Sequence, residues 1–279
     1  MINYNGNLVS QAAVNIQDNR AFLYGDAIFE TMKVLDGKIL FAEDHYFRLM
    51  ASMRIVRMEI PMHFTQEYME EQVSRLANEM RIANSCRVRL SFFRKEGGNY
   101  LPKDNNAEFI ITATALQDMV YPVYSNDYEV DLFKDFYVTK QLLSTLKSAN
   151  RLVQVTGSIY ADENGLDNCI LLNDEKNVAE ALQGNIFMLT GTKLVTPPVA
   201  DGCLNGIMRK QVLAIARNME NIELQEASIS PFDLQKADEL FITNVIMGIR
   251  PVTKYRKKIY DTKFSQELTK KLNAKVRLG

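Results

Sequence analysis

Hydrophobic and polar residues follow two different periodicities in the first third of the chain. One predicts a strand and the other a helix. Residues 86–92 alternate strictly between apolar and polar side chains, which is typical of a half-buried strand. Apolar residues recur at helical spacing between residues 69 and 80. Thr65 precedes this stretch and can cap it, and Asn84 can end it. The pattern therefore predicts a helix packed close to a strand.

The same rules, with turn residues such as Asp36-Gly37, predict the remaining elements. The other predicted strands are residues 2–9, two short strands within 33–41, 108–115, 128–133, 168–172, 185–190, 193–196 and 240–244. The other predicted helices begin at residue 43 and span 151–163, 207–220, 231–237 and 264–276. Residues 95–106, with two adjacent glycines, predict a mobile polar loop.

The pattern breaks at Pro122, which indicates a domain boundary. We expect a small N-terminal domain at 1–118, a linker at 119–127 and a larger domain at 128–279. The chain of 279 residues can bury a sizeable core. Strands alternate with helices after the break, so the sequence predicts a mixed α/β or α+β fold in two lobes.

Composition excludes several classes of protein. The 33 basic and 34 acidic residues leave a net charge of −1, which removes the usual electrostatic argument for nucleic-acid binding. No apolar run is long enough for a membrane span, and no signal peptide is evident. Three distant cysteines and two histidines do not suit a metal site. The sequence therefore predicts a reduced, cytoplasmic protein without metal.

One charged residue, Lys147, lies within an otherwise uncharged run at residues 142–150. Removal from water lowers the pKa of a lysine, and a neutral amine is a nucleophile. A lysine on the exposed side of a turn is the competing interpretation, because lysines are seldom buried without a partner. The segments around Lys147 must decide between the two.

Segments at fixed places along the chain carry a family resemblance. They are residues 20–31 (RAFLYGDAIFET), His45-x-x-Arg48-Leu49, Lys147-Ser-Ala-Asn-Arg151, Ala179-Glu180 to Asn185-Ile-Phe187, and Asn205-Gly206-Ile207-Met208-Arg209. In this order and spacing they resemble the fold-type IV pyridoxal phosphate enzymes, the class IV aminotransferase family. The resemblance extends from residue 3 to about residue 255.

The resemblance implies a small N-terminal α+β domain, a larger C-terminal α/β domain, pyridoxal 5'-phosphate in the cleft between them, and a homodimer. Lys147 matches the lysine that forms the Schiff base and moves the substrate proton. Glu180 matches the acid beside the ring nitrogen of the cofactor. The helix expected at Gly206 and Ile207 can bind the phosphate through its free N–H groups.

The resemblance also implies further site residues. Those assigned to the cofactor are Arg48, Asn185, Met208, Thr243 and Asn244. Those assigned to a small-molecule substrate are Tyr24, Phe29, Thr31, Arg94 and Arg151, with Tyr100 and Arg250 as further candidates for binding carboxylates. Aminotransferases of this family usually place hydroxyl groups where Met208 and Val245 stand, and Thr243 and Asn244 can substitute for them.

Three functions follow as hypotheses. The sequence resembles aminodeoxychorismate lyase most, which converts 4-amino-4-deoxychorismate to 4-aminobenzoate and pyruvate on the folate route. The preference for the lyase rests on three segments, which are Asn205–Arg209, Lys147–Val155 and residues 237–244. The alternative is an aminotransferase acting on branched-chain or D-amino acids with a 2-oxo acid acceptor. A non-enzymatic protein that kept only the fold is disfavoured, because Lys147 and Glu180 are both present.

Overall fold

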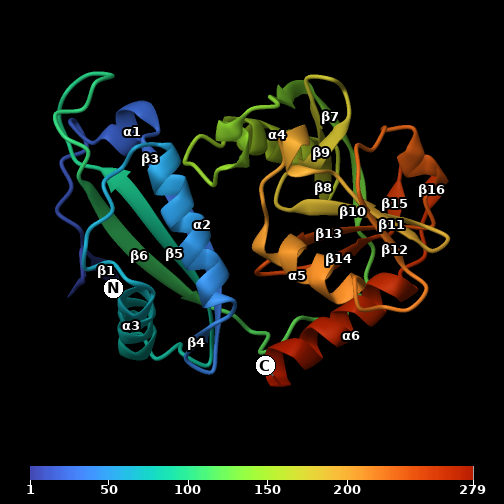
Figure 1. Ribbon diagram of the computed structural model, residues 1–279, viewed down its shortest axis with the longest axis horizontal. Helices are drawn as coiled ribbons and strands as arrows, with labels where there is room; N and C mark the ends of the chain where they lie inside the picture. The colour runs from blue at the N-terminus through green and yellow to red at the C-terminus, as the bar shows by residue number, and fades with distance from the viewer. Residues whose placement is uncertain (279) are drawn as a thin grey trace. The chain divides into compact units, whose positions relative to one another are not determined.

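A computed structural model describes residues 1–278 (Figure 1). Its contacts divide the chain into two compact units. Unit 1 comprises residues 1–120 together with Lys147–Asn150. Unit 2 comprises Tyr121–Leu146 and the residues from Arg151 onward. The short segment that carries Lys147 thus packs with unit 1, although the residues on both sides of it belong to unit 2.

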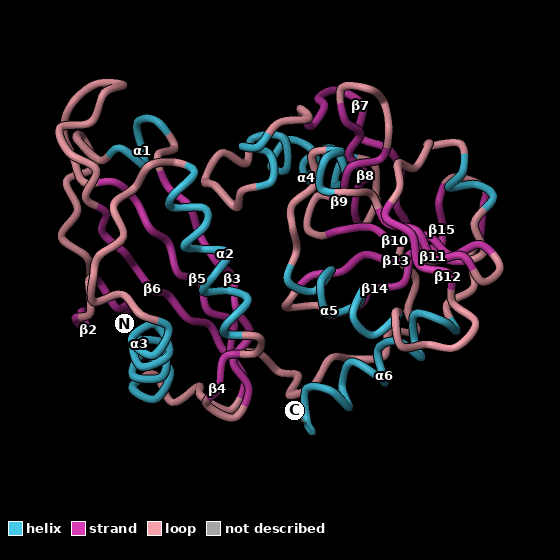
Figure 2. The backbone as a smooth tube through the Cα atoms, in the orientation of Figure 1, coloured by secondary structure: helices cyan, strands magenta, loops and turns pink. Residues whose placement is uncertain are grey.

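Unit 1 is built on a six-stranded sheet with the strand order β2-β1-β6-β5-β3-β4. Its strands are β1 (Ile2–Tyr4), β2 (Asn7–Val9), β3 (Ala27–Leu35), β4 (Lys38–Ile39), β5 (Ser85–Arg94) and β6 (Ala107–Ala115). Its helices are α1 (Arg20–Tyr24), α2 (Ala42–Ile55) and α3 (Gln66–Glu79). Figure 2 shows the long strands β3, β5 and β6 side by side, with α2 and α3 beside them.

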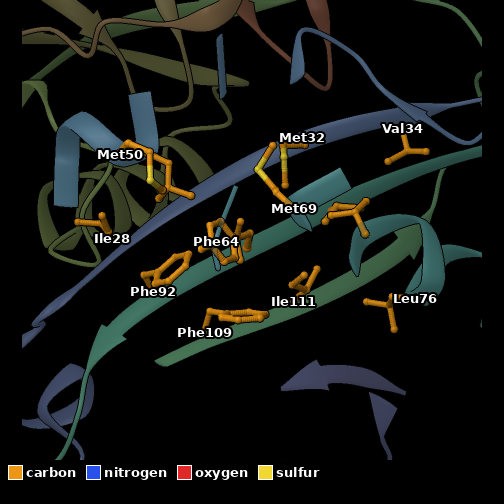
Figure 3. Packing of buried hydrophobic residues seen from close by; sticks show 14 of the residues in the cluster. Ile28, Met32, Val34, Met50, Phe64, Met69, Leu76, Phe92, Phe109 and Ile111 are labelled. Carbon is orange, nitrogen blue, oxygen red and sulfur yellow. The ribbon is translucent and has the colours of Figure 1, made fainter. Parts of the chain in front are cut away.

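The core of unit 1 lies between α2, α3 and one face of the sheet (Figure 3). Strand alternation places Ile28, Met32 and Val34 of β3 on this face. The ring of Phe64, from the loop before α3, meets the rings of Phe92 and Phe109 edge-on at 4.7 and 5.2 Å between centroids. Burial of these side chains is the main force that holds the helices on the sheet.

The predicted elements of unit 1 are present, with two differences. Residues 2–9 form a hairpin rather than one strand, because Asn5 and Gly6 both adopt positive φ angles of 49° and 85°, as a tight turn requires. The strand expected within residues 33–41 begins earlier, at Ala27. The Thr65 side chain caps α3 as expected, accepting from the Tyr68 N–H at 3.2 Å.

Unit 2 contains two five-stranded sheets, ordered β12-β11-β10-β13-β14 and β16-β15-β7-β8-β9. The strands are β7 (Glu129–Val138), β8 (Asn168–Asn173), β9 (Val178–Ala181), β10 (Asn185–Thr190), β11 (Lys193–Thr196), β12 (Glu223–Glu226), β13 (Glu239–Asn244), β14 (Gly248–Val252), β15 (Lys254–Tyr255) and β16 (Lys258–Ile259). The α-helices are α4 (Leu152–Glu163), α5 (Ile207–Ala216) and α6 (Lys263–Leu278), and the 3₁₀ turns are η1 (Leu142–Thr145), η2 (Val199–Asp201) and η3 (Asp233–Lys236).

Two predicted helices of unit 2 were too long. The helix expected at 231–237 is only the turn η3, because Ala237 is already extended and leads into β13. α5 ends at Ala216, where the Asn218 and Met219 N–H groups bond to carbonyls three residues back. Within residues 1–278, no helix combines the length and apolar character needed to span a membrane.

We expect Phe64→Ala to lower the free energy of unfolding of unit 1 by about 3–5 kcal/mol, the usual cost of removing a buried aromatic ring. Phe64 is 1% exposed and contacts both helix and strand side chains. Urea unfolding followed by far-UV circular dichroism measures the change. Met62→Ala, at a side chain that is 99% exposed, is the matched control, and an equal effect of both variants would contradict this packing role.

Candidate active site

A buried carboxylate, Glu30, is the centre of the polar cluster in unit 1. Its two oxygens accept hydrogen bonds from Arg48 Nε at 2.7 Å and Arg48 Nη2 at 2.6 Å. His45 Nδ1 lies 2.7 Å from the same carboxylate. The side chains of Glu30 and His45 are almost inaccessible to solvent. Two cationic nitrogens and an imidazole therefore replace the water that this carboxylate has lost.

The local sequence explains how this cluster forms. Glu30 occupies a core-facing position of β3, between Ile28 and Met32, where alternation would otherwise place an apolar side chain. His45 and Arg48 are three residues apart in α2, so they project from the same side of the helix. The sequence resemblance implied that Arg48 binds phosphate. In the structure, two of its nitrogens donate hydrogen bonds to Glu30 instead.

The environment shifts the pKa of both acidic and basic members of the cluster. Burial alone would raise the pKa of Glu30, but the Arg48 guanidinium and the hydrogen bond to His45 outweigh it and lower this pKa to about 2. Burial lowers the pKa of His45 despite its bond to Glu30, and the charges of Arg48 and Lys147 lower it further. Glu30 is therefore ionised and His45 neutral at pH 7.

Lys147 is fixed at the edge of β3 by its backbone. The Phe29 N–H donates to the Lys147 carbonyl at 2.8 Å, and the Ala149 N–H donates to the Ala27 carbonyl at 2.8 Å. The Lys147 Nζ atom lies 4.8 Å from the centroid of the Phe29 ring. The strand that carries Glu30 therefore also positions the candidate nucleophile.

The sequence analysis missed Arg89, which belongs to the same group. Its guanidinium lies 3.6 Å from the centroid of the Phe29 ring, and its backbone pairs with Thr31 across β3 and β5. Phe29 thus has two cations beside it, Arg89 and Lys147. The strict alternation of residues 86–92 already predicted that Arg89 lies on the face opposite the core. This was the sequence signal that could have identified it.

The other substrate candidates of unit 1 lie in different surroundings. Tyr24 ends α1 and faces Tyr100 at 5.7 Å between ring centroids. Arg94 is buried, where it donates to Asp26, Asn105 and the carbonyls of residues 56 and 57. These bonds tie the loop at 95–106 to the body of unit 1, which favours a structural role for Arg94.

In unit 2, Glu180 and Asn185 hold the same peptide segment. The Leu204 N–H donates to the Glu180 carboxylate at 2.9 Å, and the Asn185 side-chain amide donates to the Leu204 carbonyl at 2.7 Å. Leu204 comes just before the Asn205-Gly206 pair that opens α5. The family spacing between Glu180 and Asn185 therefore has a physical reason, because β9 and β10 place both side chains against one residue.

The N-terminus of α5 can bind an anion. Gly206 is its N-cap and provides no side-chain cap, so the first N–H groups, including those of Ile207 and Met208, lack acceptors within the helix. A Cβ atom at Gly206 would collide with the Asn185 side chain, so only glycine fits there. The Met208 side chain is buried, so only the backbone N–H of this residue can bind an anion there.

Thr243 and Asn244, the expected substitutes for the missing hydroxyls, differ in what they offer. Thr243 pairs with Asn185 across β10 and β13, and its buried hydroxyl oxygen has no hydrogen-bond partner within residues 1–278. The Asn244 side chain is used locally, accepting from the N–H groups of Ile246 and Met247 at 3.0 and 2.8 Å. Thr243 is therefore the better candidate ligand, and Asn244 shapes the turn after β13.

The two remaining candidate arginines, Arg151 and Arg250, donate hydrogen bonds to other residues of unit 2. Arg151 donates to the Leu146 carbonyl at 2.7 Å, so it closes the loop from which Lys147–Asn150 extends. Arg250 lies between Tyr124 and Tyr128, 4.3 Å from the centroid of each ring, and donates to Asn126 and to the carbonyl of Asp127. Both positions favour a structural role over substrate binding.

Comparison with known proteins identifies the family. The model of the amino-transferase class IV family matches residues 27–255. This chain is a class IV aminotransferase-family protein. It is 30% identical over 98% of its length to a provisionally named branched-chain-amino-acid aminotransferase of Methanocaldococcus jannaschii, covering 94% of that protein. It is 27% identical over 89% of its length to a D-alanine aminotransferase of Listeria monocytogenes, covering 85% of it.

Solved structures confirm the predicted fold class. A branched-chain aminotransferase of Thermoproteus uzoniensis matches 99% of this chain and 94% of its own, with a TM-score of 0.87 and 22% identity. A 4-amino-4-deoxychorismate lyase of Pseudomonas aeruginosa matches 98% of both chains, with a TM-score of 0.83 and 22% identity. At such identity these likenesses concern the fold alone. The relatives closer in sequence described above are aminotransferases, so they favour the alternative hypothesis over the lyase.

Membership of this family makes the chain an enzyme dependent on pyridoxal 5'-phosphate, and its residues fit that cofactor. The cofactor supplies an electron-withdrawing ring, and binding it takes an amine, an acid and an anion site. Lys147 is the candidate for the amine and Glu180 the candidate for the acid. The α5 N-terminus and the unpartnered Thr243 hydroxyl offer donors for the phosphate.

We expect Glu30→Gln to destabilise the protein by roughly 3 kcal/mol at pH 7, the magnitude that corresponds to the lowered pKa of Glu30. Because this pKa is lower in the folded state, the stabilisation is complete above about pH 5 and is lost as the pH falls towards 2. Urea unfolding of both proteins at several pH values should show their difference shrinking below pH 5. Glu71→Gln, on the exposed side of α3, is the control, and a pH-independent difference would contradict the assignment.

Proposed function

We propose that this enzyme transfers the amino group of branched-chain amino acids to a 2-oxo acid. The relative of Methanocaldococcus jannaschii, which matches nearly the whole chain, carries this proposal. D-amino acids are the variant of the same proposal, which the Listeria monocytogenes relative supports. Both versions use the same chemistry and differ in the face of the substrate that is presented.

Each proposed role uses an atom of this chain. Lys147 binds the cofactor through Nζ, and in its free form Nζ removes the α-proton of the amino acid. Glu180 holds the ring nitrogen of the cofactor in its protonated form. Arg48, the N–H groups of Ile207 and Met208, and Thr243 bind the phosphate. The predicted domain boundaries and the location of the cofactor between two lobes belong to the same proposal.

A cation beside the reactive lysine suits an acidic substrate. The Arg89 guanidinium stacks on Phe29, the ring that Lys147 also approaches. A guanidinium that is fixed on an aromatic face can bind a carboxylate in two-point fashion. We propose that Arg89 contacts the second carboxylate of an acceptor such as 2-oxoglutarate. The sequence analysis named Arg94, and not Arg89, as a candidate for substrate binding.

The lyase remains the second candidate because of Met208 and Val245. Both stand where aminotransferases of the family usually carry hydroxyl groups, and the Met208 side chain is buried away from any polar role. A lyase acting on 4-amino-4-deoxychorismate needs no amino acceptor and releases pyruvate. This difference in stoichiometry separates the two candidates.

With pyridoxal phosphate added, we expect L-leucine, L-isoleucine and L-valine to transfer their amino group to 2-oxoglutarate, giving glutamate. Lys147→Ala should reduce this rate by roughly 10²–10⁴-fold or more, because the amine acts in proton transfer as well as in binding. Glutamate formation measures the rate. Borohydride treatment followed by peptide mass spectrometry should place the cofactor adduct on Lys147.

Lys140→Ala is the matched control, since Lys140 lies seven residues away and pairs with Glu175. It should keep both the adduct and the activity. Transfer from D-alanine alone would move the proposal to D-amino acids. Release of 4-aminobenzoate and pyruvate from aminodeoxychorismate, without amino transfer, would establish the lyase instead.

We also propose that the protein forms a homodimer, as the family resemblance implies. α4 carries Leu152, Val155 and Ile159 on one face, and their exposed fractions are 78%, 52% and 53%. Leu142 and Leu143 of η1 are also more than half exposed. An apolar helix face of this kind is costly in water and is typical of an interface with another chain.

Sedimentation equilibrium should therefore give twice the chain mass of 31.9 kDa. Val155→Glu should shift the protein towards the monomer, because it places a charge in an apolar contact. Met62→Glu, at an exposed apolar residue of unit 1, should leave the mass unchanged. A monomeric wild-type protein would rule out the dimer.

A further inference from the structure

The end of β13 and the turn after it carry two donors that no protein group uses. The buried Thr243 hydroxyl has no hydrogen-bond partner within residues 1–278, and in the same part of the chain the Val245 N–H has no acceptor. Thr243 pairs with Asn185 across β13 and β10, and the Asn185 side chain lies against Gly206 at the start of α5. The turn therefore begins beside the proposed phosphate site.

Tyr121, from the segment that the sequence predicted as a linker, contacts both sides of this turn. Its hydroxyl donates to the Val245 carbonyl at 2.9 Å. Its ring packs on Gly248, where φ is 75° and a Cβ atom would lie only 2.6 Å from the ring. Burial raises the pKa of the Tyr121 hydroxyl, so this group stays protonated and remains a donor. One side chain thus fixes the residues that begin and follow the turn.

Tyr121 is itself held in place by α6. Its N–H donates to Asn273 Oδ1 at 2.9 Å, and its carbonyl accepts from Asn273 Nδ2 at 2.7 Å. The turn has further supports, because the Tyr124 hydroxyl donates to the Met247 carbonyl at 3.3 Å. The Asn244 side chain also accepts from two N–H groups of the turn. The turn therefore has a fixed shape before any ligand binds.

We infer that Tyr121 is a positioning residue for the phosphate group of pyridoxal 5'-phosphate. By holding the Val245 carbonyl, it keeps the Val245 N–H and the Thr243 hydroxyl where they can bind the phosphate without rearrangement. Val245 has no hydroxyl group, so its backbone is the only donor at this position. Donors that are already ordered bind an anion more tightly, because no ordering cost arises on binding. This inference rests on the proposed role of Thr243 but not on which amino acid is the substrate.

Two ligands that differ only in the phosphate group, pyridoxal 5'-phosphate and pyridoxal, test this role. The full-length protein is freed of cofactor and titrated with each ligand. The dissociation constant of pyridoxal divided by that of pyridoxal 5'-phosphate measures what the phosphate contributes. We expect Tyr121→Phe, which keeps the ring on Gly248, to lower this ratio roughly 3–10-fold, the usual effect of one lost hydrogen bond. Tyr124→Phe, which removes a longer bond, should lower it less.

Tyr260→Phe is the matched control, because the Tyr260 hydroxyl donates to the Leu234 carbonyl at 2.6 Å elsewhere in unit 2. It should lower the free energy of unfolding in urea, as Tyr121→Phe does, but leave the ratio unchanged. A wild-type ratio in Tyr121→Phe, or an equal fall in Tyr260→Phe, would overturn the inference and leave the proposed function intact. A protein that binds no pyridoxal 5'-phosphate would overturn both.

Discussion

The ion pair between Glu30 and Arg48 is the interaction on which the candidate active site of unit 1 depends. A carboxylate in the middle of an otherwise apolar strand face would be too costly without compensation. Arg48 and His45 provide that compensation from one helix, and so they fix the position of α2 on the sheet. The same strand holds Lys147 through the Phe29 and Ala27 backbone. A charged cluster and a backbone pairing thus position the candidate nucleophile and its surroundings together.

This arrangement was only partly predictable from the sequence. The strand at 86–92 and the helix after Thr65 follow from periodicity, because one face of each packs against the core. The pairing of Lys147–Asn150 with β3 joins residues more than a hundred positions apart, and no local pattern encodes it. Glu30 was quoted only as part of a motif, since a carboxylate on an apolar face gives no sign of its partners until α2 is placed.

The site residues show the same division. Lys147 and Glu180 were predicted from motif spacing, and the hydrogen bonds to Leu204 explain the spacing of Glu180 and Asn185. Arg94 was named as a substrate candidate and Arg89 was not, although both are arginines of β5. Only the fold reveals that Arg94 is bonded to internal carbonyls while Arg89 lies over Phe29. A single sequence can identify a charged residue. It does not show which groups that residue binds, because those groups mostly lie far away in the chain.

The two hydrogen bonds that hold Leu204, from Asn185 and to Glu180, have a consequence for how the substrate preference of such an enzyme can change. Glu180 accepts from the N–H of that residue and Asn185 donates to its carbonyl, while the helix α5 begins three residues later. The Glu180 carboxylate and the N-terminus of α5 are therefore linked through Leu204, so a shift of one displaces the other. Substitutions that alter substrate preference are tolerated more easily in segments outside these contacts, such as the loop at 95–106 of unit 1, which makes none of these hydrogen bonds.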